Sequence, residues 1–210
     1  MLAQVDADPV SIARQQPMSG LCFDRPCLVM GSAPGIDVER WKDFEGTTIG
    51  ANAGMGILWR KLGLSTHIAV TTSYLFRPGV SVQELATRDM MADTNCVTMW
   101  LDNRDDRLYR ARDVMQRRLR IEWGRLQVLN GFDRDSVQFS ALGYKSRIST
   151  GVWAVCLALA AGAREVYVDG VSLEPGHWGQ EWDDQPRDHV AEDRQAIKDL
   201  QAKGVEFCSL

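Results

Sequence analysis

The stretch that most constrains the fold of this chain runs from Arg147 to Leu173 and reads RISTGVWAVCLALAAGAREVYVDGVSL. Between Gly151 and Gly162 it has almost no polar residue, and a helix that is apolar all round is buried on most sides. A β-branched strand, predicted over 164–173, follows directly. A buried helix that leads into a buried strand favours a sheet covered by helices, as in an α/β domain.

The same alternation of apolar runs and helical segments continues along the whole chain. Strands separated by helices favour a mostly parallel sheet with helices on both faces, and continuously apolar strands agree with burial on both sides. We therefore predict a single three-layer α/β domain. Strands are predicted over 27–32, 47–52, 67–73, 96–103, 126–130, 164–173 and 204–210, and helices over 54–62, 81–91, 105–122, 151–162 and 189–203.

Length, composition and charge limit the classes of protein to consider. The 210 residues are 45% hydrophobic and 25% charged, which suits one globular domain over 21–210 after a loose leader over 1–20 without signal-peptide features. The formal charge of −4 argues against nucleic acid as a partner, and no apolar run is long enough for a transmembrane helix. Scattered cysteines without a CxxC pair favour reduced, buried thiols in a cytoplasmic protein and argue against a zinc site.

Candidate binding residues follow the predicted strands, because ligands of parallel sheets bind beyond the carboxyl ends of the strands. The small residues of the MGSAPGID segment let a ligand approach the backbone, although the segment is neither GxGxxG nor a Walker loop, and a plain turn explains it equally well. Asn52 ends the second strand, where its amide can bind a base or sugar edge or simply form a turn.

The start of the apolar helix is a candidate anion site. Ser149 or Thr150 can cap this helix, and the unpaired N–H groups of its first turn attract negative charge. Arg147 adds a fixed cation with a forked set of donors. The alternative is a capped helix beside a surface arginine.

Three histidines are candidates for acid–base chemistry. His67 begins a strand and is expected to be structural. His177 lies in the segment 174–188. His189 follows Asp188, the expected N-cap of the last helix, and precedes two carboxylates of the first turn, Glu192 and Asp193. A histidine oriented by carboxylates can act as a base, although a solvated histidine at a helix start is the simpler reading.

Two further segments have no regular place in the sheet. The segment 174–188 contains prolines, glycines and two tryptophans without a period, which suggests a short lid or binding loop, or a solvated connection pinned by its tryptophans. The arginine-rich run over 104–120 carries an apolar stripe at helical spacing. It is expected to be a solvated helix face, or a dock for an anionic glycan or lipid headgroups.

With these residues in view, the chain resembles a bacterial sialyltransferase of the type that decorates lipooligosaccharide, within a broader sialyltransferase-like and pterin-pyrophosphokinase-like group. The main match is RISTGVWAVCLALAAGAREVYVDGV: an arginine, a Ser/Thr-Gly step, an apolar helix and a strand. VMGSAP, GAN with Asn52, and HVAED at 189–193 match more weakly, in the same order along the chain.

The resemblance implies a Rossmann-like domain that transfers an acidic sugar from a CMP-activated donor to a glycan hydroxyl, with inversion and without a required metal or other cofactor. His189 would be the base and Arg147 would stabilise the leaving CMP. His177, Trp178 and Trp182 would belong to the lid. The expected donor-binding residues are Gly31, Ser32, Ala33, Pro34, Asn52, Ser149, Thr150, Gly151 and Asp169.

The expected partners are thus a nucleotide sugar and a glycan acceptor in lipopolysaccharide biosynthesis, with contact at the inner face of the membrane and a homo-oligomer left open. Two rival functions are weighed. One is a Mg-dependent pterin pyrophosphokinase-like enzyme, for which Glu181, Asp183 and Asp184 are the available metal ligands. The other is a non-catalytic nucleotide- or glycan-binding protein, which a short lid without tyrosines favours.

Overall fold

A seven-stranded parallel sheet organises the structure. The computed structural model describes residues 25–72, 96–100, 127–130, 134–144, 147–174 and 189–209. The strands are β1 (Cys27–Met30), β2 (Thr47–Ala51), β3 (Ile68–Thr72), β4 (Cys96–Trp100), β5 (Gln127–Asn130), β6 (Val166–Asp169) and β7 (Glu206–Phe207). The helices are α2 (Val38–Trp41), α3 (Gly54–Leu62), α6 (Arg134–Leu142), α7 (Thr150–Ala160) and α8 (Val190–Ala202).

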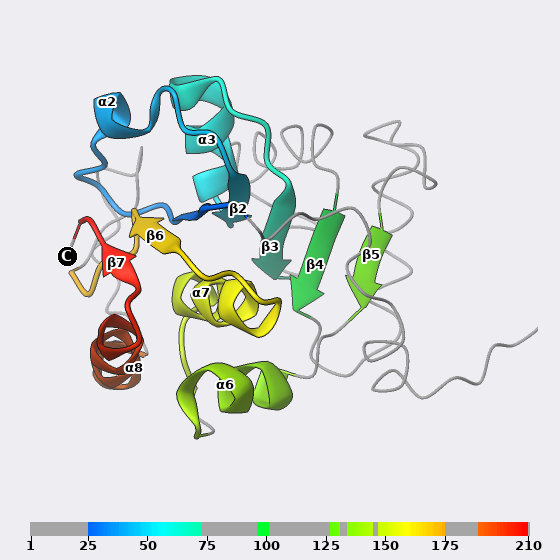
Figure 1. Ribbon diagram of the computed structural model, residues 1–210, viewed down its shortest axis with the longest axis vertical. Coiled ribbons are helices and arrows are strands. Elements are labelled where there is room, and N and C mark those ends of the chain that lie inside the picture. Colours follow the sequence, from blue (N-terminus) through cyan, green and yellow to red (C-terminus); the bar gives the residue numbers. More distant parts are fainter. Residues whose placement is uncertain are drawn as a thin grey trace, which may run out of the picture.

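The strand order is β5-β4-β3-β2-β1-β6-β7, and every neighbouring pair is parallel (Figure 1). From β1 the chain builds the sheet outward to β5 and then returns to the other side of β1 with β6 and β7. The strand order therefore reverses between β1 and β6, and a doubly wound sheet binds ligands at such a point. The register pairs Met30 with Gly50 on one side and with Asp169 on the other, so these strands end together.

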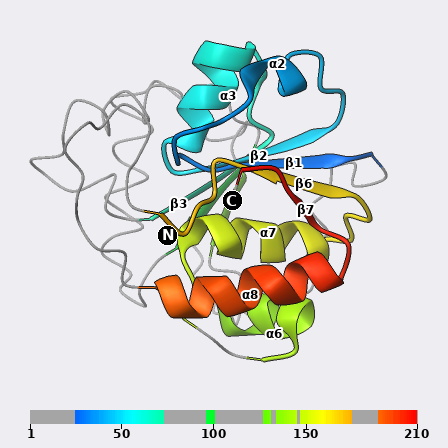
Figure 2. The same cartoon turned by 90° about the vertical axis from the view of Figure 1, so that its left-hand side faces the viewer.

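Helices cover both faces of the sheet (Figure 2). One face carries α2 and α3. On the other face α7 lies against the sheet, and α6 and α8 pack against α7. This arrangement confirms the predicted α/β architecture with a parallel sheet.

Burial of α7 confirms the prediction that opened the sequence analysis. The helix lies between the sheet and two other helices, and its side chains from Val152 to Ala158 are all buried. Strand β1 is buried along its whole length, as expected for a strand with both faces covered.

Each predicted strand forms, and three predicted helices correspond to α3, α7 and α8. The predicted helices over 81–91 and 105–122, the leader over 1–20 and most of the lid over 174–188 lie outside the described residues. Helices α2 and α6 were not predicted from the sequence. Helix α6 contains two serines and two aromatic or β-branched residues, which are weak helix formers, and it depends on packing against α7.

Two cysteines in the core agree with the expectation of buried thiols. Cys27 lies in β1 and Cys156 in α7, both fully buried. Burial raises the pKa of each thiol to about 12, so neither is ionised near neutral pH. Cys208 is a half-buried free thiol.

His67 has the structural role expected for it. Its Nδ1 accepts a hydrogen bond from the backbone N–H of Thr48 at 3.1 Å, and its own backbone N–H donates to the carbonyl oxygen of Thr48 at 3.0 Å. These bonds tie the segment before β3 to β2. Because Nδ1 accepts this hydrogen bond, it carries no proton, and the neutral ring is the form that fits here.

We expect the free energy of unfolding to fall as the pH drops through about 6.5, the ordinary pKa of histidine. Burial lowers the pKa of His67 in the folded state, so the unfolded chain takes up the proton first and low pH favours unfolding. Urea denaturation between pH 5.5 and 7.5 measures this slope. His67→Gln keeps an acceptor without a titrating ring and should flatten it; an unchanged slope would contradict the assignment.

Candidate functional site

The carboxyl ends of β1 and β6 are tied together where the strand order reverses. The backbone N–H of Gly31 donates to the carbonyl oxygen of Asp169 at 2.7 Å, and that of Ala33 donates to Gly170 at 2.7 Å. In this loop Ser32 is half-buried and Pro34 is exposed. The predicted donor loop after β1 therefore has a defined backbone with accessible residues at its outer side.

Helix α3 begins directly against this loop. A Cβ atom on Gly54, the first residue of α3, would lie 2.1 Å from the carbonyl oxygen of Met30, and one on Gly31 would lie 2.1 Å from the carbonyl oxygen of Gly170. Only glycine permits such close backbone contacts. The N-terminus of α3 is consequently held at the end of β1.

Asn52 makes the turn between β2 and α3. Its φ of 50° makes it the one non-glycine residue with positive φ among the described residues, a conformation that asparagine tolerates better than most residues. Its backbone N–H donates to the carbonyl oxygen of Val70 at 2.9 Å, and its carbonyl oxygen accepts the backbone N–H of Met55 at 3.3 Å. No residue in the described ranges bonds the half-buried side-chain amide, which leaves it available to a ligand.

The start of α7 lies on the other side of the same edge. Ser149 is the N-cap, and its Oγ accepts the N–H of Val152 at 3.4 Å. A Cβ on Gly151 would lie 3.0 Å from Cγ2 of Val171, which follows Gly170. Within the described part of the chain nothing accepts the backbone N–H groups of Thr150 and Gly151, so both can bind an anion.

Arg147 lies two residues before Ser149, the N-cap of α7. Its side chain is exposed and makes no ion pair with any residue that the structure describes. An exposed arginine two residues before the cap of a helix with two open N–H groups is suited to binding an anion.

His189 is brought to this edge by α8. It is the N-cap of α8 without a side-chain capping bond, which corrects the expectation that Asp188, outside the described residues, caps this helix. The Nδ1 atom of His189 is buried and has no partner in the described ranges. Because Nδ1 is enclosed, Nε2 is the ring nitrogen that can meet a substrate.

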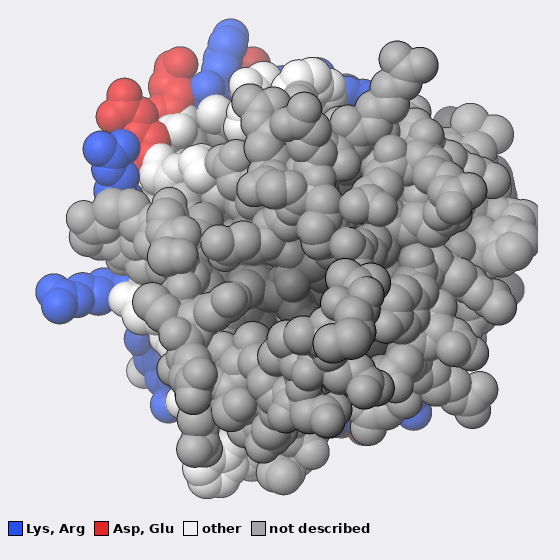
Figure 3. Space-filling model, turned by 90° about the vertical axis from the view of Figure 1, so that its right-hand side faces the viewer, with Lys and Arg blue, Asp and Glu red and all other residues white. Residues whose placement is uncertain are grey.

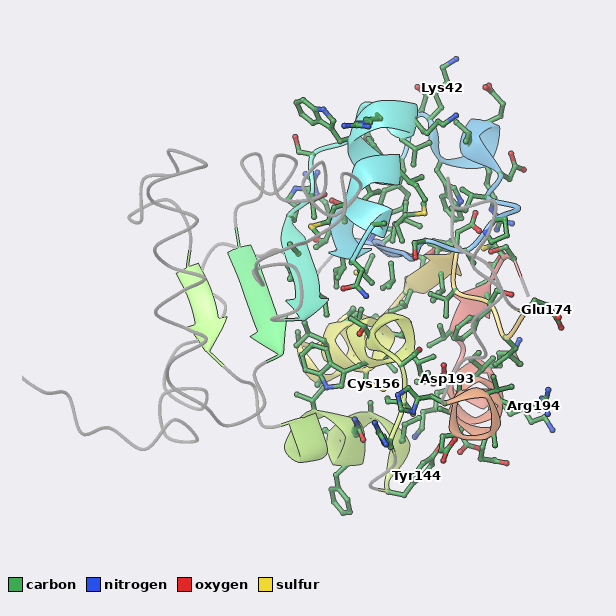
Figure 4. The ribbon with its side chains drawn as sticks, turned by 180° about the vertical axis from the view of Figure 1, so that it is seen from behind. Lys42, Tyr144, Cys156, Glu174, Asp193 and Arg194 are labelled. Carbon is green, nitrogen blue, oxygen red and sulfur yellow. The ribbon has the colours of Figure 1, made fainter. Side chains whose placement is uncertain are left out.

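Asp193 connects the starts of α7 and α8. Its side chain is buried, and Oδ1 accepts the backbone N–H of Ser149 at 2.8 Å. Figure 4 shows Asp193 on α8 at the side that faces α7. Asp193 was predicted to lie in the first turn of this helix, but its bond to Ser149 was not predicted. Its signal was a carboxylate on the apolar stripe with Ala196, Ile197 and Leu200.

Asp169, one of the predicted donor-binding residues, is buried and makes internal hydrogen bonds. Only 1% of it is exposed. Its Oδ2 accepts the indole N–H of Trp41 at 2.7 Å, and its Oδ1 accepts the N–H of Gly170 at 2.7 Å. The same N–H also donates to Oγ of Ser209 at 2.9 Å. Asp169 thus shapes the loop after β6.

The remaining predicted site residues lie outside the described ranges. These are the lid residues His177, Trp178 and Trp182, the carboxylates Glu181, Asp183 and Asp184, and the arginine-rich run over 104–120. Glu174, at the start of the lid segment, is exposed. Within the described residues, no group of three or more histidine, cysteine or acidic side chains is placed to hold a metal ion.

Among the described residues that are visible in Figure 3, acidic and basic side chains lie next to each other at the upper left. None of the described helices has the length and apolar character needed to cross a membrane. The edge of the sheet therefore remains the main candidate site: the loop after β1, Asn52, the open start of α7 and His189.

No protein-family model matches the sequence, and no curated protein matches it. The fold is similar to that of the sialyltransferase CstII of Campylobacter jejuni with the substrate analogue CMP-3FNeuAc, at 15% identity and a TM-score of 0.51, covering 89% of this chain and 80% of that chain.

Two further sialyltransferase structures share this fold. The monofunctional α-2,3-sialyltransferase Cst-I of Campylobacter jejuni has 15% identity and a TM-score of 0.55, covering 89% of this chain and 75% of that chain. A CST-II complex with a trisaccharide acceptor and CMP has 14% identity and a TM-score of 0.52, covering 89% and 81%. These similarities show that the chain has a sialyltransferase-like fold.

Proposed function

We propose that the chain is a sialyltransferase-like glycosyltransferase that moves an acidic sugar from a CMP-activated donor to a glycan hydroxyl, with inversion and without a metal. The observation that carries this proposal is the pair of open backbone N–H groups at Thr150 and Gly151, set beside the glycine-packed loop where the strand order reverses. Such a helix start suits a phosphate. The fold likeness to enzymes solved with CMP supports the choice of nucleotide.

Each part of the site has a role in the proposed reaction. The loop after β1 and the amide of Asn52 bind the nucleotide or sugar. The start of α7 and Arg147 stabilise the negative charge that develops on departing CMP, often the largest contribution to catalysis. His189 accepts the proton of the acceptor hydroxyl at Nε2.

In the proposed single displacement, the acceptor oxygen forms a bond to the anomeric carbon as the bond from that carbon to the CMP oxygen breaks. The electron pair of the broken bond leaves with CMP, and the proton goes to His189. Attack from the side opposite the leaving group inverts the anomeric centre. A cytoplasmic place at the inner face of the membrane, in lipopolysaccharide synthesis, belongs to the same proposal.

Nucleotide binding tests this function before any acceptor is known. We expect CMP to raise the melting temperature, with CDP, UDP, GDP and ATP giving smaller shifts. A ligand at 100 times its dissociation constant adds about 2.7 kcal/mol, or about 5–11 °C for a chain of this size. No shift with CMP would reject the proposal. A larger shift with ATP and magnesium that EDTA abolishes would also reject it, and would favour the pyrophosphokinase-like alternative.

Arg147→Ala should weaken CMP binding by about 10–100-fold, because charge-assisted hydrogen bonds are worth about 1.5–3 kcal/mol. The melting temperature without ligand should hardly change, since the side chain is exposed. Titration calorimetry measures the dissociation constant. Arg164→Ala is the matched control, because Arg164 is also exposed but precedes β6 at the amino end of the strand. Equal binding by Arg147→Ala and the wild type would remove Arg147 from the site.

A further inference from the structure

We propose that Asp193 is a positioning residue, which holds the first turn of α8, and with it His189, against the N-terminal end of α7. This inference rests on the proposed function, in which His189 is the base and the start of α7 binds the anionic donor. In this proposal Asp193 touches neither the sugar donor nor the acceptor. It acts by fixing the position of His189 relative to the start of α7.

The contacts of Asp193 run in both directions. Its carboxylate accepts the backbone N–H of Ser149, the N-cap of α7, at 2.8 Å. Its own backbone N–H donates to the carbonyl oxygen of His189 at 2.8 Å. The second bond is the backbone bond of the first turn of α8, so the Asp193 side chain ties the cap of α7 to the turn that begins at His189.

Ser149 in turn organises the first turn of α7. Its carbonyl oxygen accepts the N–H of Trp153 at 2.9 Å, and its Oγ accepts the N–H of Val152. These bonds leave the N–H groups of Thr150 and Gly151 for a ligand. A shift of Ser149 would therefore move both of these N–H groups together.

Burial makes this link specific. Asp193 is 4% exposed and occupies the apolar face of α8 with Ala196, Ile197 and Leu200. A buried carboxylate is costly unless hydrogen bonds compensate it, so an aspartate here needs a defined partner. Burial raises the pKa of the Cys156 thiol in α7 to about 12, and the negative charge of Asp193 contributes to that rise.

Catalysis depends steeply on such positioning. A displacement of about 1 Å between reacting groups can reduce the rate by about 10²-fold. If Asp193 fixes the distance between His189 and the donor, its loss should reduce turnover more than it reduces donor binding.

The test compares Asp193→Ala, Asp193→Asn and the control Asp199→Asn, in which a carboxylate farther along α8 that bonds Gln195 loses its charge. Each variant is first checked for folding by thermal unfolding, and kinetics are expressed per folded molecule. For Asp193→Ala we expect kcat to fall about 10–100-fold with the KM for the donor changed by less than about threefold. Asp193→Asn retains an acceptor oxygen for Ser149 and should recover most of the lost kcat; Asp199→Asn should match the wild type.

A wild-type kcat in folded Asp193→Ala, or a loss of kcat in Asp193→Asn as large as in Asp193→Ala, would overturn the positioning role. If the wild type neither binds CMP nor transfers sugar, the proposed function fails. Amide hydrogen exchange then tests, without any assay of function, whether Asp193 holds the starts of α7 and α8 together. Faster exchange in Asp193→Ala at both Ser149 and the first turn of α8, with the rest of both helices unchanged, supports it; faster exchange at only one end refutes it.

Discussion

Replacing His189 with alanine is expected to lower kcat by about 10²–10⁴-fold, the range attributed to general acid–base catalysis. Binding of CMP should remain close to that of the wild type, because the nucleotide is proposed to contact the loop after β1 and the start of α7. Steady-state assays of sugar transfer measure kcat, and titration calorimetry with CMP measures the dissociation constant. A proportional loss of both would indicate that His189 contributes to donor binding or to the fold.

The pH dependence gives a second test of the same residue. A histidine must be neutral to accept a proton, so wild-type activity should fall at low pH and the remaining activity of His189→Ala should lack that fall. His67→Gln is the matched control: His67 is also half-buried but lies before β3, at the amino end of the sheet. Normal turnover in His189→Ala would leave the proposed mechanism without its base, whereas CMP binding without sugar transfer by the wild type would favour a non-catalytic binding protein.

Gly54→Ala is expected to destabilise the fold by about 3 kcal/mol or more, at the upper end of the cost of overpacking. The added Cβ would lie 2.1 Å from the carbonyl oxygen of Met30 and 2.7 Å from that of Gly31. Both neighbours are backbone atoms of β1 and its loop, and they cannot move without shifting the strand. The loss should lower the melting temperature by about 6–12 °C, measurable by calorimetry.

Gly151→Ala provides the matched comparison, because Gly151 also lies in the first turn of a helix. The three described atoms nearest to its added Cβ would all belong to the side chain of Val171, the closest at 3.0 Å. Alanine also has the higher helix propensity, so we expect a change within about 1 kcal/mol in either direction. Equal effects of the two substitutions would show that helix propensity, rather than the contact with β1, decides the role of Gly54.

The architecture could be predicted because it depends on patterns within short segments. Seven apolar, β-branched runs predicted seven strands, and burial of the helix from Thr150 to Ala160 followed from its lack of polar residues. Helix α6 was missed for the same reason, since its residues have weak helix propensity and it forms by packing on α7. A pattern within one segment carries no information about such packing.

The sequence by itself determined the parallel sheet, the buried helix with a cap at Ser149 or Thr150, and the placing of small or polar residues after β1 and β2. Tertiary structure alone decided which polar groups remain open to a ligand. Asp169 and Asp193 were both carboxylates of the predicted site region, yet Asp169 bonds Trp41 and Gly170, and Asp193 bonds Ser149. Their partners lie 128, 1 and 44 residues away along the chain. A buried carboxylate takes whatever donors the folded chain brings to it, and most of these contacts exist only once the sheet and helices have packed.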